Sequence, residues 1–331
     1  MHRHKTGHAH GVLRLANRLA RPLDRLASSS KPGIAGPIMV VGLPRSGTTL
    51  VYELLVQAFE VGFLTRLFSY TYGLPNFSTR LVARKIRDPL ARFDSTYGKI
   101  PGHFAPAENA VFWERWFAER EELGHHIPSR CISDRAKREA EAIIASMSAI
   151  ARRPFVFKNV YMTLSVPAFL QLLPRAKVII VQRNLESVVA SLYKGRKTHA
   201  TWWSIRPPFT ADVYSRNTFE QTVFQCVRSQ QILERTIASM APSQCLTVDY
   251  ESICEAPKGF VERVSVWAGT DFARRSNGMI PDRFKASKGP GIPKTLASNY
   301  ASLTDSLNDT GEKYWSRIRS FVAERNLDAR S

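Results

Sequence analysis

Two separate groups of basic and hydroxyl-bearing residues have the types and spacing of phosphate-binding sites. The first is Arg45-Ser-Gly-Thr-Thr49, and the second pairs Arg183 with Ser191, eight positions later. Hydroxyl and backbone N–H groups donate hydrogen bonds to phosphate oxygens, and an arginine fork can donate two at once. The sequence therefore predicts two anion sites in one chain.

The first group lies between a predicted strand and a predicted helix. Residues 38–41 form a short apolar run rich in branched side chains, which is typical of a buried strand. Gly42 and Gly47 bound a tight loop, and apolar residues recur at helical spacing from Thr48 onward. The loop and the helix N-terminus would both point unpaired N–H groups at one place. We expect a phosphate there.

The spacing of Gly42 and Gly47 is that of a P-loop, but one important residue differs. In nucleotide triphosphatases a lysine directly follows the second glycine, and the next Ser or Thr binds Mg²⁺. Here Thr48 takes the lysine position and the cation, Arg45, lies inside the loop. This pattern indicates a phosphorylated nucleotide whose chemistry does not need Mg²⁺ in the same way, and no metal site is expected.

Both groups resemble motifs of one enzyme family. The segment Gly42-Leu-Pro-Arg-Ser-Gly-Thr-Thr49 resembles the 5′-phosphosulfate loop of sulfotransferases that use PAPS (3′-phosphoadenosine 5′-phosphosulfate). Arg183 follows a predicted central strand at 178–181, and Ser191 lies two turns into the next predicted helix; together they resemble the family's 3′-phosphate site. Asn184-Leu185 replaces the family's usual Asp-Pro.

The resemblance spans about residues 38–270 and implies a fold and a reaction. The fold is α/β, a P-loop-containing three-layer nucleotide-binding fold with a central parallel sheet flanked by helices. We expect residues 37–331 to form this sulfotransferase domain. The reaction is transfer of a sulfuryl group from PAPS to a hydroxyl or amine of an acceptor, such as a glycan or a lipid-linked glycan.

The resemblance also implies roles for individual residues. The residues expected to bind the cofactor are Arg45, Ser46, Gly47, Thr48, Thr49, Arg183 and Ser191. Arg45 and Lys158, from a neighbouring predicted strand, would stabilise the charge that develops during transfer. Glu108, which precedes an aromatic helical segment at 109–117, is the first candidate for the general base, and His103 and His199 are the second and third.

Composition favours anionic partners. The 331 residues include 47 Lys and Arg against 28 Asp and Glu, a net charge of +19. The four cysteines show no Cys-x-x-Cys spacing, which favours free thiols in a reducing compartment. The sequence contains neither an apolar run of transmembrane length nor a secretory signal. We expect a cytoplasmic protein that binds no nucleic acid.

Residues 1–36 form a separate N-terminal segment that ends in a linker. It begins with a histidine-rich tract, and residues 12–26 then predict a basic amphipathic helix, broken near Pro22. The apolar face consists of Val12, Leu15, Leu19, Leu23 and Leu26. The basic face consists of Arg14, Arg18, Arg21 and Arg25. This helix can contact a membrane surface, act as a targeting segment, or pack its leucines on the domain.

Three further segments carry expectations. Residues 61–65 predict a second strand. Residues 193–216 are basic and aromatic, and predict a loop over the cofactor or the acceptor entrance, or else tryptophans packed on the core. The loop at 284–293 contains Lys288-Gly289, which resembles a cofactor-binding segment of cytosolic sulfotransferases.

Two other functions remain open from the sequence. A P-loop kinase or NTPase needs a metal-binding acid after a strand, and Asp249 could supply it. A basic membrane- or nucleic-acid-binding protein would explain the charge and the N-terminal helix, but it would not explain two ordered phosphate motifs.

Overall fold

One sheet of four parallel strands organises the computed structural model, in the order β2-β1-β3-β4. The strands are β1 (Ile38–Gly42), β2 (Val156–Lys158), β3 (Lys177–Gln182) and β4 (Cys245–Asp249). The register pairs Val40 with Lys158 and Gly42 with Val181. All four carboxyl ends therefore lie at one edge of the sheet, where ligands bind in open α/β folds. The predicted α/β fold is confirmed.

The structure describes residues 7–31, 33, 36–87, 93, 100–198, 203–276, 278–287, 289 and 291–325. Its longer helices are α1 (Gly7–Ala20), α2 (Thr48–Ala58), α4 (Pro75–Arg87), α6 (Asp134–Ala151), α8 (Leu185–Thr198), α9 (Thr218–Ser239), α11 (Pro257–Ala268), α12 (Ala297–Asp309) and α13 (Gly311–Glu324). The shorter ones are α3 (Phe68–Thr71), α5 (Ala110–Trp113), α7 (Val166–Leu172) and α10 (Tyr250–Glu255). The 3-10 turns are η1 (Arg21–Ala27), η2 (Ser129–Cys131), η3 (Val160–Leu164), η4 (Thr210–Val213) and η5 (Lys294–Leu296).

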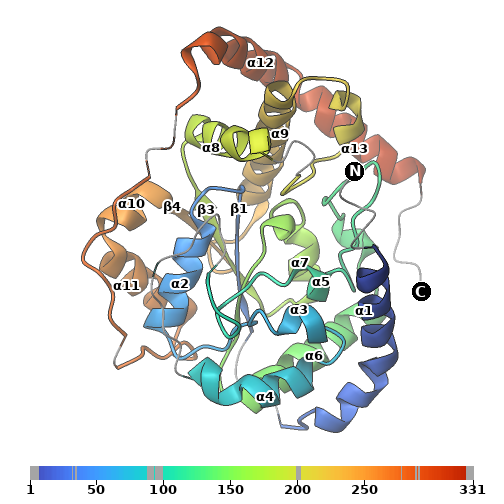
Figure 1. The fold of residues 1–331 in the computed structure, drawn as a ribbon, viewed down its shortest axis with the longest axis vertical. Coiled ribbons are helices and arrows are strands. Elements are labelled where there is room, and N and C mark those ends of the chain that lie inside the picture. Colours follow the sequence, from blue (N-terminus) through green and yellow to red (C-terminus); the bar gives the residue numbers. More distant parts are fainter. Residues whose placement is uncertain are drawn as a thin grey trace.

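Helices cover both faces of the sheet. In Figure 1, α2 and α11 lie on one side of the strands and α7 lies on the other. Strands β1 and β2 are buried along their whole length, as continuous apolar runs between two helical layers require. A second apolar cluster joins α13 to the segment around Phe209, through Tyr314 and Ile318. The core thus fixes the strand ends that carry the predicted site.

Some predicted elements differ in the structure. Residues 61–65 form only isolated bridges, Gly62 with Phe155 and Thr65 with Pro106, rather than a strand. The aromatic helix expected at 109–117 ends at Trp113. The N-terminal helix breaks beside Pro22 as predicted, since α1 ends at Ala20 and a 3-10 turn follows. All four cysteines are free thiols. Among the described helices, none has the length and apolarity to cross a membrane.

Candidate active site

The loop after β1 begins and ends at glycines whose surroundings leave no room for a Cβ. Thr163 fixes its start, because the Gly42 N–H donates to Thr163 Oγ1 at 3.1 Å and the Thr163 hydroxyl donates back to the Gly42 carbonyl at 2.9 Å. Gly47, which precedes α2, has φ of 95°. A Cβ there would lie 2.2 Å from the ring of Tyr250. The first turn of α2 is therefore reached through a tight, left-handed position.

Arg45 connects this loop to the second predicted phosphate motif. Its Nε donates to Ser191 Oγ on α8 at 3.1 Å. Its carbonyl accepts a hydrogen bond of 2.9 Å from Nη1 of Arg183, which directly follows β3. The structure thus brings three of the predicted cofactor-binding residues into one hydrogen-bonded group.

Arg183 is buried against several partners. Its guanidinium stacks on the ring of Tyr250, with Cζ 4.5 Å from the centroid. Its Nε lies 3.5 Å from Oε1 of Glu251, and its Nη2 donates to the carbonyl of Ser287. The loop that contains Ser287 therefore lies beside Arg183, and Gly289 of the same loop lies beside Ser187 of α8. Lys288, expected from the sequence to bind cofactor, lies outside the described residues.

The three hydroxyl-bearing residues that follow Arg45 have different surroundings. Ser46 is buried, and within the described part of the chain its Oγ has no hydrogen-bond partner. Thr49 Oγ1 accepts a hydrogen bond of 2.8 Å from Lys158 Nζ. Thr48 is buried at the start of α2. A buried hydroxyl without a partner costs free energy unless a ligand or water satisfies it, so Ser46 suits an oxyanion guest.

Lys158 and Glu108 meet at the end of β2. The Lys158 ammonium is almost completely buried and lies 2.6 Å from Oε1 of Glu108. Asn109 fixes the backbone beside Glu108: its Nδ2 donates to the carbonyl of Thr65 at 2.9 Å, and its Oδ1 accepts from Ser69 at 2.6 Å. The structure thus places the first candidate base next to the candidate lysine.

The other candidate bases are not placed in this way. His103 lies exposed in a turn, and its carbonyl accepts a backbone hydrogen bond from Leu67. No hydrogen bond or ion pair among the described side chains joins His103 to Lys158 or to the loop after β1. His199 lies outside the described residues. Their roles stay predictions.

A pocket of about 470 Å³ opens beside Lys158 and Glu108. Asn159 and Tyr161, which directly follow the lysine strand, line it, as does Ala110 just after Glu108. Its other lining residues include Arg14, Trp113, Glu114, Phe117, Glu119, His125, Trp203 and Arg206. Trp203 and Arg206 belong to the basic, aromatic segment that was expected over the cofactor or the acceptor entrance.

Two ion pairs flank this pocket. Arg14 lies 3.2 Å from Glu114, and Arg206 lies 2.8 Å from Glu119. Burial, with added repulsion from nearby carboxylates, raises the pKa of the Tyr161 phenol to about 12, so the phenol keeps its proton at neutral pH and can act as a hydrogen-bond donor. The pocket therefore combines aromatic rings with charged and hydrogen-bonding groups.

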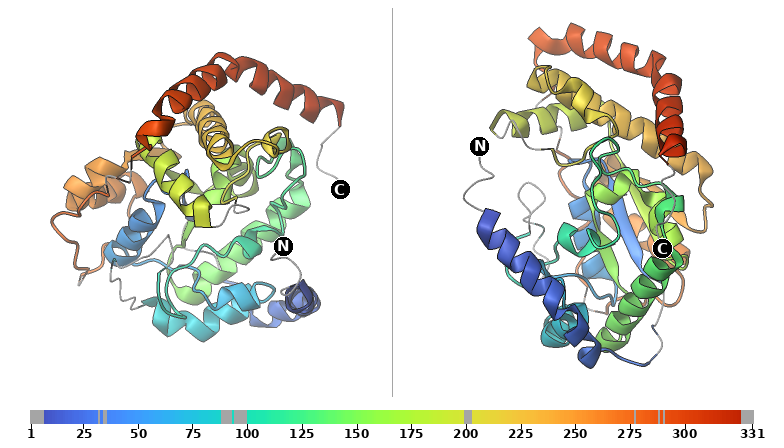
Figure 2. Two further views of the ribbon diagram at one scale, coloured as in Figure 1. Left: turned by 45° about the horizontal axis from the view of Figure 1, so that its top comes forward. Right: turned by 90° about the vertical axis from the view of Figure 1, so that its right-hand side faces the viewer.

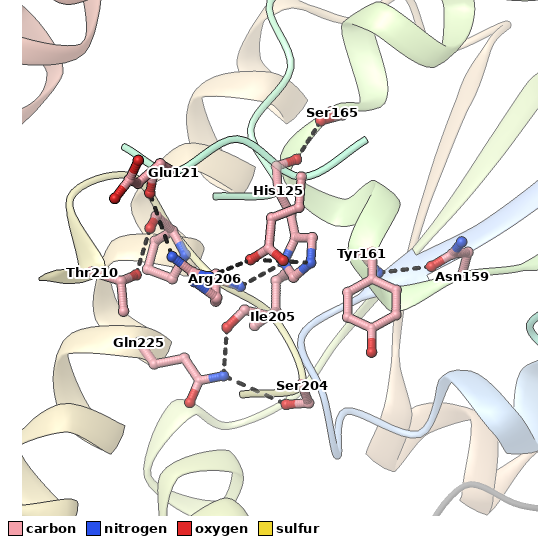
Figure 3. Close-up of polar contacts among 12 residues, drawn as sticks. Glu121, His125, Asn159, Tyr161, Ser165, Ser204, Ile205, Arg206, Thr210 and Gln225 are labelled. Carbon is pink, nitrogen blue, oxygen red and sulfur yellow. Dashed lines mark hydrogen bonds and ion pairs between the residues drawn. The ribbon is translucent and has the colours of Figure 1, made fainter. Parts of the chain in front are cut away.

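One wall of the pocket is formed by two segments hydrogen-bonded to each other (Figure 3). The Arg206 N–H donates to Nδ1 of His125 at 2.8 Å, and the His125 N–H donates to the Arg206 carbonyl at 2.9 Å. Gln225 fixes the second segment from α9, with its Nε2 2.7 Å from the Ile205 carbonyl. These contacts keep Arg206 at the pocket edge.

His125 is neutral in this wall. Burial, and then the neighbouring Arg206 guanidinium, lower its pKa to about 4. Because Nδ1 accepts a hydrogen bond, the ring proton lies on Nε2, which faces Glu119 at 3.8 Å. His125 and Tyr161 were not predicted from the sequence. The signal available was a His-His pair after the aromatic segment, with nothing local to indicate its partners.

Asp249, the acid that a kinase would need, has a structural role here. It caps α10, with Oδ1 accepting hydrogen bonds from the N–H and the hydroxyl of Ser252 at 2.8 and 2.9 Å. Across the described part of the chain, no group of three or more His, Cys, Asp or Glu residues has the arrangement of a metal site.

Comparisons with known proteins give a consistent result. The sequence model of the sulfotransferase family matches residues 37–274. Sulfotransferase STF1 from Mycobacterium tuberculosis H37Rv has 15% identity, with 77% of this chain and 72% of that chain covered and a TM-score of 0.48. Sulfotransferase STF9 from Mycobacterium avium has 16% identity, with 83% of this chain and 68% of that chain covered and a TM-score of 0.45. A sulfotransferase domain from the curacin biosynthetic pathway has 15% identity, with 85% of this chain and 99% of that chain covered and a TM-score of 0.43. No curated protein matched.

Proposed function

The chain belongs to the sulfotransferase family, and from that premise we propose that it transfers a sulfuryl group from PAPS to a hydroxyl or amine of an acceptor. The observation that carries the proposal is the 3.1 Å hydrogen bond between Arg45 Nε and Ser191 Oγ. It joins the loop suited to a 5′-phosphosulfate to the helix suited to a 3′-phosphate. PAPS has phosphates on both of these ribose positions.

The loop after β1 fits the donor's anionic end. Ser46 has a buried hydroxyl with no partner among the described residues. The first N–H groups of α2 lack intrahelical acceptors by geometry, and the helix dipole adds positive potential. Gly47 leaves no room for a Cβ. Backbone from Ser46 to Thr49 would donate to the phosphosulfate, while Arg183 and Ser191 would bind the 3′-phosphate.

The reaction forms a bond from the acceptor oxygen to sulfur and breaks the bond from sulfur to the oxygen shared with phosphate. Negative charge develops on that leaving oxygen, where Lys158 and Arg45 would stabilise it. Glu108 would take the proton from the acceptor hydroxyl. The ion pair of Lys158 with Glu108, at 2.6 Å, supports these two separate roles, because it keeps an acid and a base together beside the pocket.

The pocket beside Lys158 is the proposed acceptor site. Its aromatic residues, Trp113, Phe117, Tyr161 and Trp203, suit the apolar face of a sugar ring or a lipid chain. Its paired charges can exchange partners for hydroxyl groups of the acceptor. A glycan or a glycolipid is the acceptor class that matches this mixture.

A thermal-shift titration tests the donor assignment. Adenosine 3′,5′-bisphosphate at one hundred times its Kd should raise the melting temperature by about 5 °C, because it binds only the folded chain. Adenosine 5′-monophosphate, which lacks the 3′-phosphate, should give a smaller shift. The shift with ATP and Mg²⁺ should be no larger than the shift with the monophosphate. A response to ATP with Mg²⁺ alone would overturn the proposal in favour of a kinase.

A further inference from the structure

The N-terminal helix packs on the domain with its polar side. Five large apolar residues of α1 and η1 are 58–86% exposed, whereas Asn17 and Asp24 are buried. We call the exposed set the leucine face: Val12, Leu15, Leu19, Leu23 and Leu26. The expectation that these leucines pack on the domain is therefore wrong. The helix lies along the outer edge of the molecule (Figures 1 and 2).

Specific hydrogen bonds fix this orientation. Asn17 Nδ2 donates to the carbonyl of Tyr70 at 2.9 Å, and Asn17 Oδ1 accepts from the Gly73 N–H at 2.7 Å. Asp24 accepts hydrogen bonds from the N–H groups of Asn76 and Phe77 at the N-terminus of α4. Both side chains satisfy backbone groups that would otherwise be unpaired. Turning the leucines inward would break all of these bonds.

The neighbouring helix α4 also carries exposed apolar residues. Phe77 and Leu81 lie one turn apart on that helix and are both exposed. Arg80, between them, donates to the carbonyls of Ala27 and Ser28 at the end of η1. These hydrogen bonds place α4 against the end of η1. An apolar surface of this extent on a soluble chain indicates a binding partner.

Positive charges border the leucine face. Among the side chains that the structure describes on α1, η1 and α4, the exposed basic ones are Arg14, Arg18, Arg21, Arg25, Arg80, Arg84 and Lys85. A second copy of the same chain would bring like charges together, which disfavours self-association through this surface. Anionic lipid headgroups complement the arginines, and the hydrocarbon boundary accepts the leucines. We propose that the leucine face, with Phe77 and Leu81, binds an anionic lipid membrane surface.

The position of Arg14 connects this surface to the acceptor pocket. Arg14 belongs to α1 and also lines the pocket, where it pairs with Glu114. The pocket therefore lies beside the membrane-binding helix. If the proposed sulfotransferase function holds, on which this step rests, the acceptor class is a membrane-resident amphiphile whose hydroxyl-bearing headgroup enters the pocket.

Vesicle flotation of the purified full-length chain tests the proposal. The probes are vesicles of phosphatidylglycerol with phosphatidylcholine, and vesicles of phosphatidylcholine alone. The test variant is Leu15→Glu with Leu19→Glu. The matched control is Val266→Glu with Met279→Glu, which changes two exposed apolar residues elsewhere and adds the same charge. Stabilisation by adenosine 3′,5′-bisphosphate reports separately whether each variant is folded and whether the proposed donor site works.

The parent chain should float with the anionic vesicles and stay behind with the neutral ones. The leucine variant should bind at least about tenfold more weakly, since two apolar side chains no longer enter the lipid. The control should match the parent within about twofold. The proposal would be overturned if the two variants bound equally well, or if the parent bound both vesicle types equally. It would also be overturned if a chain that the bisphosphate stabilises bound no vesicles. If the parent and the control are dimers and only the leucine variant is a monomer, the leucine face binds a second copy of the chain instead.

Discussion

Arg45 and Ser191 are 146 positions apart in the sequence, yet the Arg45 Nε–H donates to the Ser191 hydroxyl at 3.1 Å. This bond places the Ser191 side chain, on α8, against the loop after β1. A nucleotide with phosphates at both ends of its ribose would contact both elements at once. Interactions with the two phosphates are then coupled through one hydrogen-bonded group.

Ser191→Ala should therefore weaken binding of adenosine 3′,5′-bisphosphate by about tenfold to a hundredfold, since it removes one hydrogen bond to a charged ligand and one to Arg45. Isothermal titration calorimetry measures this change. Ser316→Ala is the matched control, because Ser316 on α13 also accepts a hydrogen bond from an arginine, Arg319, far from the site in sequence. Equal losses in the two variants would contradict a role for Ser191 in binding the nucleotide.

The Glu251 carboxylate lies 3.5 Å from Nε of Arg183, where it would compete with the proposed 3′-phosphate. Glu251→Gln should raise bisphosphate affinity a few-fold by removing a like charge from the phosphate site. Arg183→Lys should lower it by about tenfold or more, since lysine keeps the charge but loses the fork. An Arg183→Lys chain that binds as tightly as the parent would show that the 3′-phosphate lies elsewhere.

Glu108→Gln tests the proposed general base. With Glu108 neutral, kcat should fall by about 10²–10⁴-fold while bisphosphate binding changes little, because the proposed role of the carboxylate is on the acceptor rather than on the nucleotide. Glu139→Gln, which removes a carboxylate that pairs with Arg115 on the surface of α6, should leave kcat near the parent value. If His103→Gln loses the activity and Glu108→Gln keeps it, the base is His103.

The local parts of the site were predictable from the sequence. Strand β1, its glycine loop and α2 follow one another without a break, so a short stretch of sequence indicates their order and type. Arg183 and Ser191 were predictable for the same reason, being the end of a strand and the second turn of the next helix. The pocket wall was not, because His125 and Arg206 are 81 positions apart and Gln225 of α9 fixes the segment beside them.

Periodicity also predicted the two faces of the N-terminal helix without indicating which of them is buried. Apolar burial usually decides this, but here Asn17 and Asp24 satisfy backbone groups of residues 70–77. Polar satisfaction therefore outweighs apolar packing in this segment. Residues 61–65 were misassigned because an apolar run also suits an irregular segment that bridges a strand edge at Gly62.

Neutral His125 gives stability that depends on pH. Its pKa of about 4 in the folded chain rises to about 6.5 on unfolding, so between these values the unfolded chain binds a proton that the folded chain does not. The stabilisation is full above pH 6.5 and is lost as the pH falls toward 4. Urea unfolding at pH 7 and pH 5 should show about 2 kcal/mol less pH dependence in His125→Gln than in the parent.

His103→Gln is the control for this measurement, because it makes the same substitution at an exposed histidine outside the pocket wall. Its pH dependence should follow that of the parent. Burial also lowers the pKa of His126, so some pH dependence should remain in His125→Gln. Parallel curves for the parent and His125→Gln would contradict a neutral, buried His125.

Gly47→Ala tests whether the tight loop is needed for nucleotide binding. The new Cβ would lie 2.2 Å from the Tyr250 ring, which stacks on Arg183, so the ring must move and take the guanidinium with it. Gly269→Ala is the control: φ there is 87°, but nothing lies within 4 Å of the added Cβ. It should cost about 1–3 kcal/mol of backbone strain and leave bisphosphate affinity intact. Gly47→Ala should cost more stability and lower the affinity at least about tenfold, measured by calorimetry on folded protein; unchanged affinity would mean that the loop after β1 does not bind the phosphosulfate end.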